Sequence, residues 1–343
     1  MVYMKNNPRV SVLMPTYNDA EYLPDAINSI LVQTFDDFEL IIVDDGSTDN
    51  TRELLSTYSD QRLKILSLEK NCGRPTARNI ALDAATGEYL CWMDSDDISL
   101  PKRLEKQVQF MDAHPEISVC SGKILYFHEA DGTWAPPLLH KDIETGLFFA
   151  PTIANAAACM RASAIKKYNL RFDPELYRAQ DYDFWCQLVL DKKGAAANLD
   201  EILYLYRYRK RSSKQCHKIV QKKILDRLHI KDTDETLQKY IEFSFLNSEE
   251  FSFTFKEYAQ FAETILASNG TYKVFNQIQL SRLLADQLFR LSRKFHSSRY
   301  GAIVLCLQNM QFSALVYLFF SLTTRKLLHS LKKLEKTLAQ KVT

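Results

Sequence analysis

The sequence lacks paired cysteine motifs, long apolar runs and a secretory signal. Its seven cysteines are odd in number and form no Cys-x-x-Cys pair, which favours free thiols in a reducing compartment over a disulfide framework. No stretch reaches the roughly 18 uninterrupted apolar residues that a membrane-spanning helix needs; residues 301–322 come nearest, but Gln308, Asn309 and Gln311 interrupt them. The N-terminus shows no apolar core of a signal peptide. We therefore expect a cytoplasmic protein.

A strong net charge and a glycine-rich first loop are also absent. A net charge of +2 over 343 residues argues against a general nucleic-acid binder. The loop after the first apolar run reads Pro15-Thr16-Tyr17-Asn18-Asp19-Ala20. It has neither the Gly-x-Gly-x-x-Gly turn of a dehydrogenase nor the glycine-rich basic loop in which a nucleotidyltransferase would hold a triphosphate. With 46% hydrophobic residues, the chain can still bury a sizeable core beside an active-site cleft.

The first 121 residues alternate between strand-like and helix-like patterns. The predicted strands are residues 10–14, 39–43, 62–68, 88–93 and 117–121, and the predicted helices between them are residues 22–33, 75–85 and 101–113. This alternation predicts an α/β fold with a mostly parallel central sheet flanked by helices. Such sheets bind ligands at the carboxyl ends of their strands. The segments after three strands, residues 15–18, 44–47 and 94–97, should therefore gather along one edge.

The strand–helix alternation does not continue beyond residue 121. Residues 122–215 are irregular apart from a predicted helix at 181–190 and a predicted strand at 202–209, and residues 216–343 are helical. We therefore divide the chain into a first half of the α/β domain at residues 1–121, a second half at 122–215 and a helical C-terminal region at 216–343.

The acidic cluster Asp94, Asp96 and Asp97 follows an apolar strand. Three carboxylates within four residues repel one another unless a cation neutralises them. Mg²⁺ and Mn²⁺ accept oxygen ligands and often bind through one or two carboxylates plus substrate phosphates. The pattern therefore favours a metal–diphosphate site. The alternative is a purely structural role, in which Asp97 or Ser99 caps the helix that begins at Pro101.

A second acidic pair and a basic loop accompany this cluster. Asp44-Asp45 ends another apolar strand, where one acid is suited to bind a base ring N–H or a ribose hydroxyl, or else to form a turn. Residues 70–75 lead into a helix that carries Arg78, and a helix N-terminus attracts anions. Gly73 would let the backbone approach a ligand closely. The alternative for Arg78 is an exposed, solvated side chain without a functional role.

These motifs together resemble the family 2 glycosyltransferases of the GT-A fold. The resemblance covers about residues 8–210 and rests on the order and spacing of five motifs: Pro15-Thr16-Tyr17-Asn18, Ile41-Ile42-Val43-Asp44-Asp45-Gly46-Ser47-Thr48-Asp49, Ala77-Arg78-Asn79, Gly87-Glu88-Tyr89 and Asp94-Ser95-Asp96-Asp97. It implies that residues 1–121 bind the nucleotide-sugar and residues 122–215 bind the acceptor. It also implies a UDP-sugar donor and a Mn²⁺ or Mg²⁺ cofactor.

The resemblance also implies residue roles. Asp44 would bind the uracil edge, and Asp96 would coordinate the metal on the diphosphate. The other implied nucleotide-sugar contacts are Pro15 and Tyr17 at the uracil and ribose, Gly73 and Arg78 on the nucleotide, and Asp94 near the ribose and donor sugar.

Two downstream positions complete the implied site. Asp181 matches the family's general base, with Gln180 where a Glu is usual. A carboxylate there would take the proton of the acceptor hydroxyl in an inverting transfer; the alternative for Asp181 is a helix N-cap. Arg209 stands where family members often have a His near the diphosphate, and a guanidinium can bind a diphosphate through two parallel hydrogen bonds. A flexible basic loop is the alternative for Arg209.

The predicted function is therefore inverting, metal-dependent transfer of a hexosyl or N-acetylhexosaminyl group from a UDP-sugar to a glycan or lipid-linked glycan, in cell-surface polysaccharide synthesis. A catalytically silent nucleotide-sugar-binding or scaffold subunit is the alternative.

An apolar stretch at residues 315–320 precedes a basic amphipathic one at residues 325–341. This pattern predicts peripheral contact with the inner face of the cell membrane, or else a helical packing or dimer surface.

Overall fold

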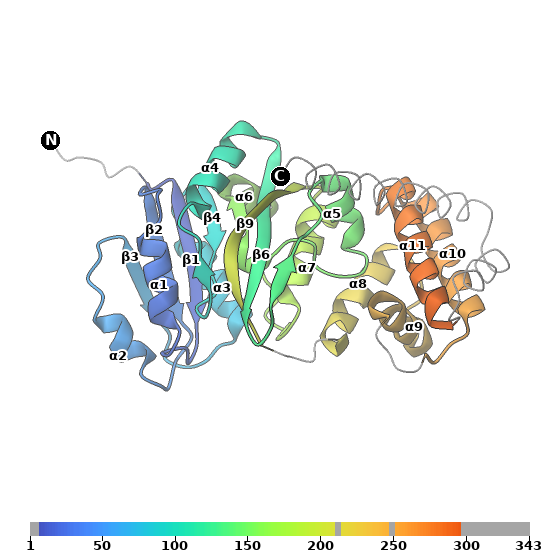
Figure 1. Ribbon diagram of the computed structural model, residues 1–343, viewed down its shortest axis with the longest axis horizontal. Helices are drawn as coiled ribbons and strands as arrows, with labels where there is room; N and C mark the ends of the chain where they lie inside the picture. The colour runs from blue at the N-terminus through green and yellow to red at the C-terminus, as the bar shows by residue number, and fades with distance from the viewer. Residues whose placement is uncertain (1–6, 210–213, 247–250, 296–343) are drawn as a thin grey trace, which may run out of the picture. The chain divides into compact units, whose positions relative to one another are not determined.

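The computed structural model describes residues 7–209, 214–246 and 251–295. It contains two compact units, Met1–His217 and Lys218–Thr343, and Figure 1 shows the sheet of the first unit and the helices of the second. The six cysteines of the described residues form no disulfide bond. Within the same residues, no helix is both long enough and apolar enough to cross a membrane.

The first unit is built on one mixed sheet with the strand order β3-β2-β1-β4-β8-β6-β9-β5 and β7 paired to β6. Its strands are β1 (Val10–Thr16), β2 (Phe38–Asp44), β3 (Leu63–Ser67), β4 (Tyr89–Trp92), β5 (Ile98–Ser99), β6 (Ile117–His128), β7 (Gly132–Trp134), β8 (Cys159–Arg161) and β9 (Ala195–Tyr208). Its α-helices are α1 (Leu23–Leu31), α2 (Thr51–Ser56), α3 (Arg74–Ala84), α4 (Arg103–Ala113), α5 (His140–Gly146), α6 (Ala162–Tyr168) and α7 (Gln180–Cys186).

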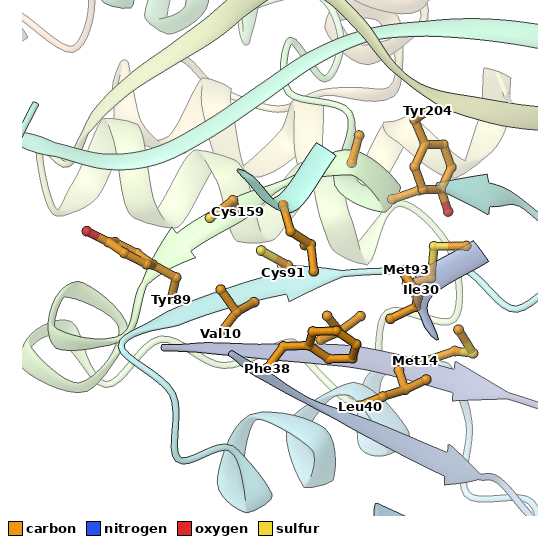
Figure 2. Close-up of a cluster of buried hydrophobic side chains, with 14 of the residues drawn as sticks. Val10, Met14, Ile30, Phe38, Leu40, Tyr89, Cys91, Met93, Cys159 and Tyr204 are labelled. Carbon is orange, nitrogen blue, oxygen red and sulfur yellow. The ribbon is translucent and has the colours of Figure 1, made fainter. Parts of the chain in front are cut away.

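Strands β3, β2, β1 and β4 run parallel to their neighbours, so their carboxyl ends share one edge. Alternating residues of these strands face opposite sides of the sheet. One side packs against the apolar stripe of α1, and Figure 2 shows Val10, Met14, Leu40 and Ile30 in that cluster. Parallel strands buried on both faces need the continuous apolar runs that the sequence has here.

The strands and helices predicted for residues 1–121 are present in the predicted order, but the short helix α2 and the two-residue strand β5 were not predicted. The second half departs from a simple alternation. β8 inserts antiparallel between β4 and β6. β6 extends to His128 because it pairs in parallel with β9 as far as the His128–Tyr208 position, with register shifts around Gly122 to Ile124. The predicted helix at 181–190 is α7 followed by a π-helical segment, Gln187–Asp191. β9 starts at Ala195, earlier than predicted.

The second unit is helical where it is described: α8 (Lys218–Arg227), α9 (Asp234–Phe245), α10 (Phe255–Tyr272) and α11 (Gln277–Phe295). Thr233 caps α9, and Thr254 forms a reciprocal capping box with Glu257 at the start of α10. Aromatic side chains such as Tyr240, Phe243 and Tyr258 are buried between these helices. The predicted membrane contact of residues 315–341 lies outside the described residues.

Candidate active site

The loops after β1, β2 and β4 are joined by hydrogen bonds. The Asn18 N–H donates to Ser47 Oγ at 2.9 Å, and the Thr48 N–H donates to Asn18 Oδ1 at 2.8 Å. On the other side, Ser95 Oγ donates to Asp19 Oδ2 at 2.5 Å. The prediction that the three segments gather at one edge is therefore confirmed, and the site is built from short loops on a rigid sheet.

The second acid of the β2 turn organises the loop that leads into α3. Asp45 accepts hydrogen bonds from the N–H groups of Cys72, at 2.7 Å, and Gly73, at 2.9 Å. Burial raises the pKa of Asp45 and these two hydrogen bonds oppose that rise. Gly73 has φ 90° as the N-cap of α3, a backbone region that favours glycine. Asp45 is thus a residue that shapes this loop, which is one of the two roles left open for the pair.

Gly46 lets the β2 turn approach that same loop. A Cβ built on Gly46 would lie 2.3 Å from the carbonyl carbon of Lys70, and φ is 71°. No other residue fits without moving the backbone. The turn after β2 and the loop before α3 are therefore packed as one surface.

Asp44, Pro15 and Tyr17 lie beside this surface. The Asp44 carboxylate is fully buried; it accepts from the Ser47 N–H at 3.0 Å and from Arg52 Nε at 2.9 Å. Pro15 lies at the end of β1, and Tyr17 is 42% exposed just beyond it. The uracil contacts assigned to these residues stay predictions, and in the free protein Arg52 already occupies one oxygen of Asp44.

The acidic turn after β4 is held by strand β9. The Asp94 N–H donates to the hydroxyl of Tyr204 at 3.0 Å, and the Arg207 N–H donates to Asp97 Oδ1 at 2.7 Å. Arg207 Nε also donates to the carbonyl of Asp96 at 2.8 Å. Asp97 and Ser99 do not cap the next helix, because the N-cap of α4 is Lys102.

Asp96 carries the clearest sign of crowded negative charge. Burial, followed by the nearby Asp94 and Asp19 carboxylates, raises the pKa of Asp96 to about 6. The pKa of Asp97 is also well above its usual range, chiefly because Asp97 is buried and Asp94 is close. A bound cation would relieve this repulsion. The groups around it are oxygen donors, which suit Mg²⁺ or Mn²⁺.

Few protein ligands are available to such a cation. Within the described residues, no three His, Cys, Asp or Glu side chains are placed to hold a metal together. A metal here would therefore need further oxygens from a diphosphate and water, as is common for Mg²⁺.

Arg78 joins the β4 turn to α7. Its side chain is buried, with Nη2 3.5 Å from Asp94 Oδ1. Its guanidinium lies over the rings of Trp92 and Phe172. In the amide orientation that satisfies Gln180, Oε1 accepts from Arg78 Nη1 at 3.2 Å, and the amide nitrogen donates to two backbone carbonyls just before α7. Burial lowers the pKa of Arg78, while the carboxylates of Asp94 and Asp181 oppose the change.

Asp181 lies in the first turn of α7. The N-cap is Ala179, whose φ is 57°, so Asp181 is not the N-cap. Asp181 Oδ1 accepts from the Tyr182 N–H at 2.9 Å, and the residue remains partly exposed. The structure thus brings Asp181 near the same buried arginine that meets Asp94, although the two acids are far apart in the sequence.

Sequence reasoning missed three side chains of this site. They are Tyr22, Arg207 and His217. Arg207 and the predicted Arg209 both lie over the ring of Tyr22, at 4.3 and 4.8 Å from its centroid. His217 packs at 5.2 Å from Tyr182; burial lowers the pKa of His217, and Asp181 opposes that shift. The alternation of Tyr and Arg in residues 206–209 was a signal for Arg207, but nothing local marks Tyr22 or His217.

Solved structures with the same architecture define the class of the fold. The crystal structure of residues 1–349 of S. aureus TarS matches with a TM-score of 0.57 at 21% identity and covers 84% of this chain and 92% of that one. The complex of the same TarS fragment with UDP-GlcNAc matches with a TM-score of 0.55 at 21% identity, over 89% and 93% of the two chains. The fold is therefore the GT-A fold of glycosyltransferases.

Sequence comparisons give the family. The model of glycosyl transferase family 2 matches residues 11–168. The putative teichuronic acid biosynthesis glycosyltransferase TuaG of Bacillus subtilis is 35% identical over 205 residues, which are 58% of this chain and 79% of TuaG. The chain therefore belongs to glycosyl transferase family 2 and is a glycosyltransferase.

A further relative has a more detailed name. The UDP-Glc:alpha-D-GlcNAc-diphosphoundecaprenol beta-1,3-glucosyltransferase WfgD of Escherichia coli is 30% identical over 206 residues, which are 58% of this chain and 76% of WfgD.

Proposed function

We propose that this glycosyltransferase transfers a sugar with inversion from a UDP-sugar to a hydroxyl group of a glycan or lipid-linked glycan. The observation that carries the proposal is the position of Arg78, which lies 3.5 Å from Asp94 and 3.2 Å from Gln180, the residue before Asp181. A donor bound at the β4 turn would thus have its reacting carbon near a carboxylate on α7.

Asp181 is proposed as the general base. The acceptor hydroxyl oxygen attacks the anomeric carbon, the new C–O bond forms, and the hydroxyl proton passes to the Asp181 carboxylate. The bond from the anomeric carbon to the diphosphate oxygen breaks, and UDP leaves. Attack opposite the leaving group inverts the configuration, so one carboxylate is sufficient for the proton transfer. Asp181 is partly exposed, and its Oδ1 accepts a hydrogen bond from the Tyr182 N–H, an environment that suits this role.

Asp96 is proposed to hold a Mg²⁺ or Mn²⁺ ion on the diphosphate. When bound, the ion neutralises the charge that develops on the departing diphosphate. Arg209 is proposed to bind the same diphosphate, since it lies 3.2 Å from Asp96. Asp44, Pro15 and Tyr17 are proposed for the base and ribose, and Gly73 and Arg78 for the nucleotide.

The choice of donor and acceptor draws on the relatives. WfgD is named for UDP-Glc and a diphosphoundecaprenol-linked acceptor, and TarS has been crystallised with UDP and UDP-GlcNAc. TuaG is named for teichuronic acid biosynthesis. We infer a UDP-hexose or UDP-N-acetylhexosamine donor and a role in surface polysaccharide synthesis, at the cytoplasmic side of the membrane.

The test combines thermal shift and donor hydrolysis. The full chain and its Asp96→Ala variant are incubated with UDP-, GDP- and TDP-sugars, with Mn²⁺ or with EDTA. The proposal expects stabilisation and slow hydrolysis of a UDP-sugar with Mn²⁺, and loss of both in the variant. Binding of no nucleotide-sugar under either condition would contradict it.

A further inference from the structure

Asp96 has a cationic partner in the free protein. Arg209 Nη2 lies 3.2 Å from Asp96 Oδ2, and both side chains are largely covered, at 29% and 23% exposed. The contact is an ion pair without hydrogen-bond geometry, since this nitrogen is buried and has no hydrogen-bond partner in the described part of the chain. The guanidinium therefore offers charge to Asp96 but keeps an unused N–H donor.

The neighbouring arginine is held quite differently. Arg207 donates its N–H to Asp97 and its Nε to the carbonyl of Asp96. Both guanidinium groups lie over the same Tyr22 ring. The backbone of Arg207 is thus fastened to the acidic turn by one hydrogen bond and its guanidinium by another, whereas the Arg209 guanidinium forms an ion pair and lies over a ring face. Of the two cations, Arg209 needs to break fewer directional contacts to move.

A divalent metal at Asp96 would compete with Arg209. A metal ion on the Asp96 carboxylate would lie close to the Arg209 guanidinium, and the two cations would repel each other, which favours movement of the guanidinium. A diphosphate offers the displaced guanidinium a better partner, since its oxygens accept paired N–H donors with correct geometry. Tyr22 would remain as a surface along which the guanidinium can turn.

We propose that Arg209 is a displaceable counter-ion of Asp96, which neutralises this carboxylate in the free protein and transfers to the diphosphate when metal and nucleotide bind. This inference rests on the proposed metal site at Asp96. It makes metal and UDP binding mutually dependent. Metal alone must displace Arg209 without compensation, whereas metal with UDP gives Arg209 a new partner. By linkage, UDP must then tighten metal binding by the same factor as metal tightens UDP binding.

The substitution Arg209→Gln gives two effects of opposite sign. Without the competing cation, Mn²⁺ alone should bind about threefold more tightly, the size expected for loss of a partly exposed ion pair. UDP at saturating Mn²⁺ should bind roughly tenfold more weakly, because a charge-assisted contact to the diphosphate is lost. General damage to the site would weaken both.

The experiment measures Mn²⁺ binding without nucleotide, by electron paramagnetic resonance of the free ion, and UDP binding at saturating Mn²⁺ by calorimetry. Arg209→Lys keeps the charge without the paired donors, so Mn²⁺ affinity should stay near that of the wild type while UDP affinity falls. Arg9→Gln is the matched control, since Arg9 forms half-exposed ion pairs just before β1, at the opposite edge of the sheet.

The outcomes separate this inference from the proposed function. Tighter Mn²⁺ and weaker UDP binding by Arg209→Gln, with Arg9→Gln unchanged, supports the exchange. Unchanged or weaker Mn²⁺ binding by Arg209→Gln overturns the exchange, while loss of Mn²⁺ binding by Asp96→Asn in the same series leaves the metal site standing. Wild-type Mn²⁺ affinity in Asp96→Asn overturns the metal site itself, and the exchange with it.

Discussion

The two acidic turns of the sheet look alike in sequence, but their carboxylates are bound differently. Asp44 ends β2 and Asp45 follows it, and four protein donors bind their carboxylates: Ser47 N–H, Arg52 Nε, Cys72 N–H and Gly73 N–H. The turn after β4 has three acids, with Asp19 nearby, and burial among like charges raises the pKa of Asp96 to about 6.

The comparison suggests how to distinguish structural acids from functional ones. A buried carboxylate whose oxygens are bound by protein donors stabilises its own surroundings. A carboxylate crowded by others is costly until a ligand supplies the missing positive charge. By this measure Asp45 belongs to the framework, Asp96 has only the Arg209 ion pair against its crowded surroundings, and the partly exposed Asp181 retains room to accept a proton.

The largest effect is expected for Asp181→Asn. An amide cannot take the proton of the acceptor hydroxyl, so transfer should fall by about 10²- to 10⁴-fold. UDP affinity should change little, because the residue is proposed to act on the acceptor. Rate assays with donor and acceptor, together with calorimetry of UDP, measure the two quantities.

Asp83→Asn is the matched control for Asp181→Asn, because Asp83 forms an exposed ion pair with Arg171. If Asp181→Asn retained wild-type transfer rates, Asp181 would not be the base.

Asp45→Asn should lower the stability of the protein. In the wild type, the two carboxylate oxygens of Asp45 accept from the N–H groups of Cys72 and Gly73. In the variant, one of these N–H groups would face the amide NH₂ group, which cannot accept a hydrogen bond. The expected loss is about 1–3 kcal/mol in the free energy of unfolding. Chemical denaturation at neutral pH measures it. An unchanged midpoint would mean that the loop before α3 does not depend on Asp45.

Glu242 extends the comparison to the helical unit. Burial opposes its ionisation, but hydrogen bonds from Ser252, Tyr258 and Gln238 outweigh burial and lower its pKa. A lowered folded-state pKa stabilises the fold above the unfolded-state pKa, near 4.5. That contribution is lost as the pH falls through the folded-state value.

The substitution Glu242→Gln should therefore cost about 1–2 kcal/mol at pH 7. The difference between variant and wild type should shrink as the pH falls below about 4.5, the unfolded-state value. Denaturant melts from pH 7 to pH 3 follow this difference, and a constant difference across that range would rule out the charge as its source.

The smallest effect is expected for Asp96→Asn in EDTA, and its sign is opposite to that of Asp45→Asn. Removing one carboxylate from a crowded turn should raise stability by on the order of 1 kcal/mol, since repulsion and burial outweigh the Arg209 pair. Melting in EDTA measures the change. Destabilisation by both substitutions would erase the distinction between the two turns.

Local patterns were sufficient to predict most elements of the first half of the fold and the gathering of its loops, but not the short α2 and β5. The apolar runs of β1, β2 and β4 and the turn residues after them are short-range signals. They could not separate Asp44 from Asp45, because both follow the same strand and differ only in which distant donors reach them.

Long-range packing determined what the sequence could not predict. β8 joins the sheet antiparallel through pairing with β4 and β6, which no local periodicity encodes. Tyr22 meets Arg207 and Arg209 from the opposite end of the unit's sequence. The contact of Gln180 with Arg78 likewise depends on the folded chain, since the pattern alone marked Gln180 only as a departure from Glu.

The most direct test of a metal-assisted nucleotide site at the β4 turn is calorimetric titration of UDP into the wild-type protein with Mn²⁺ and again with EDTA, alongside Asp96→Asn. The site as described predicts that Mn²⁺ tightens UDP binding by at least about tenfold in the wild type, the gain of one charge-assisted contact, and by much less in Asp96→Asn. Equal UDP affinity with Mn²⁺ and with EDTA in the wild type would contradict it.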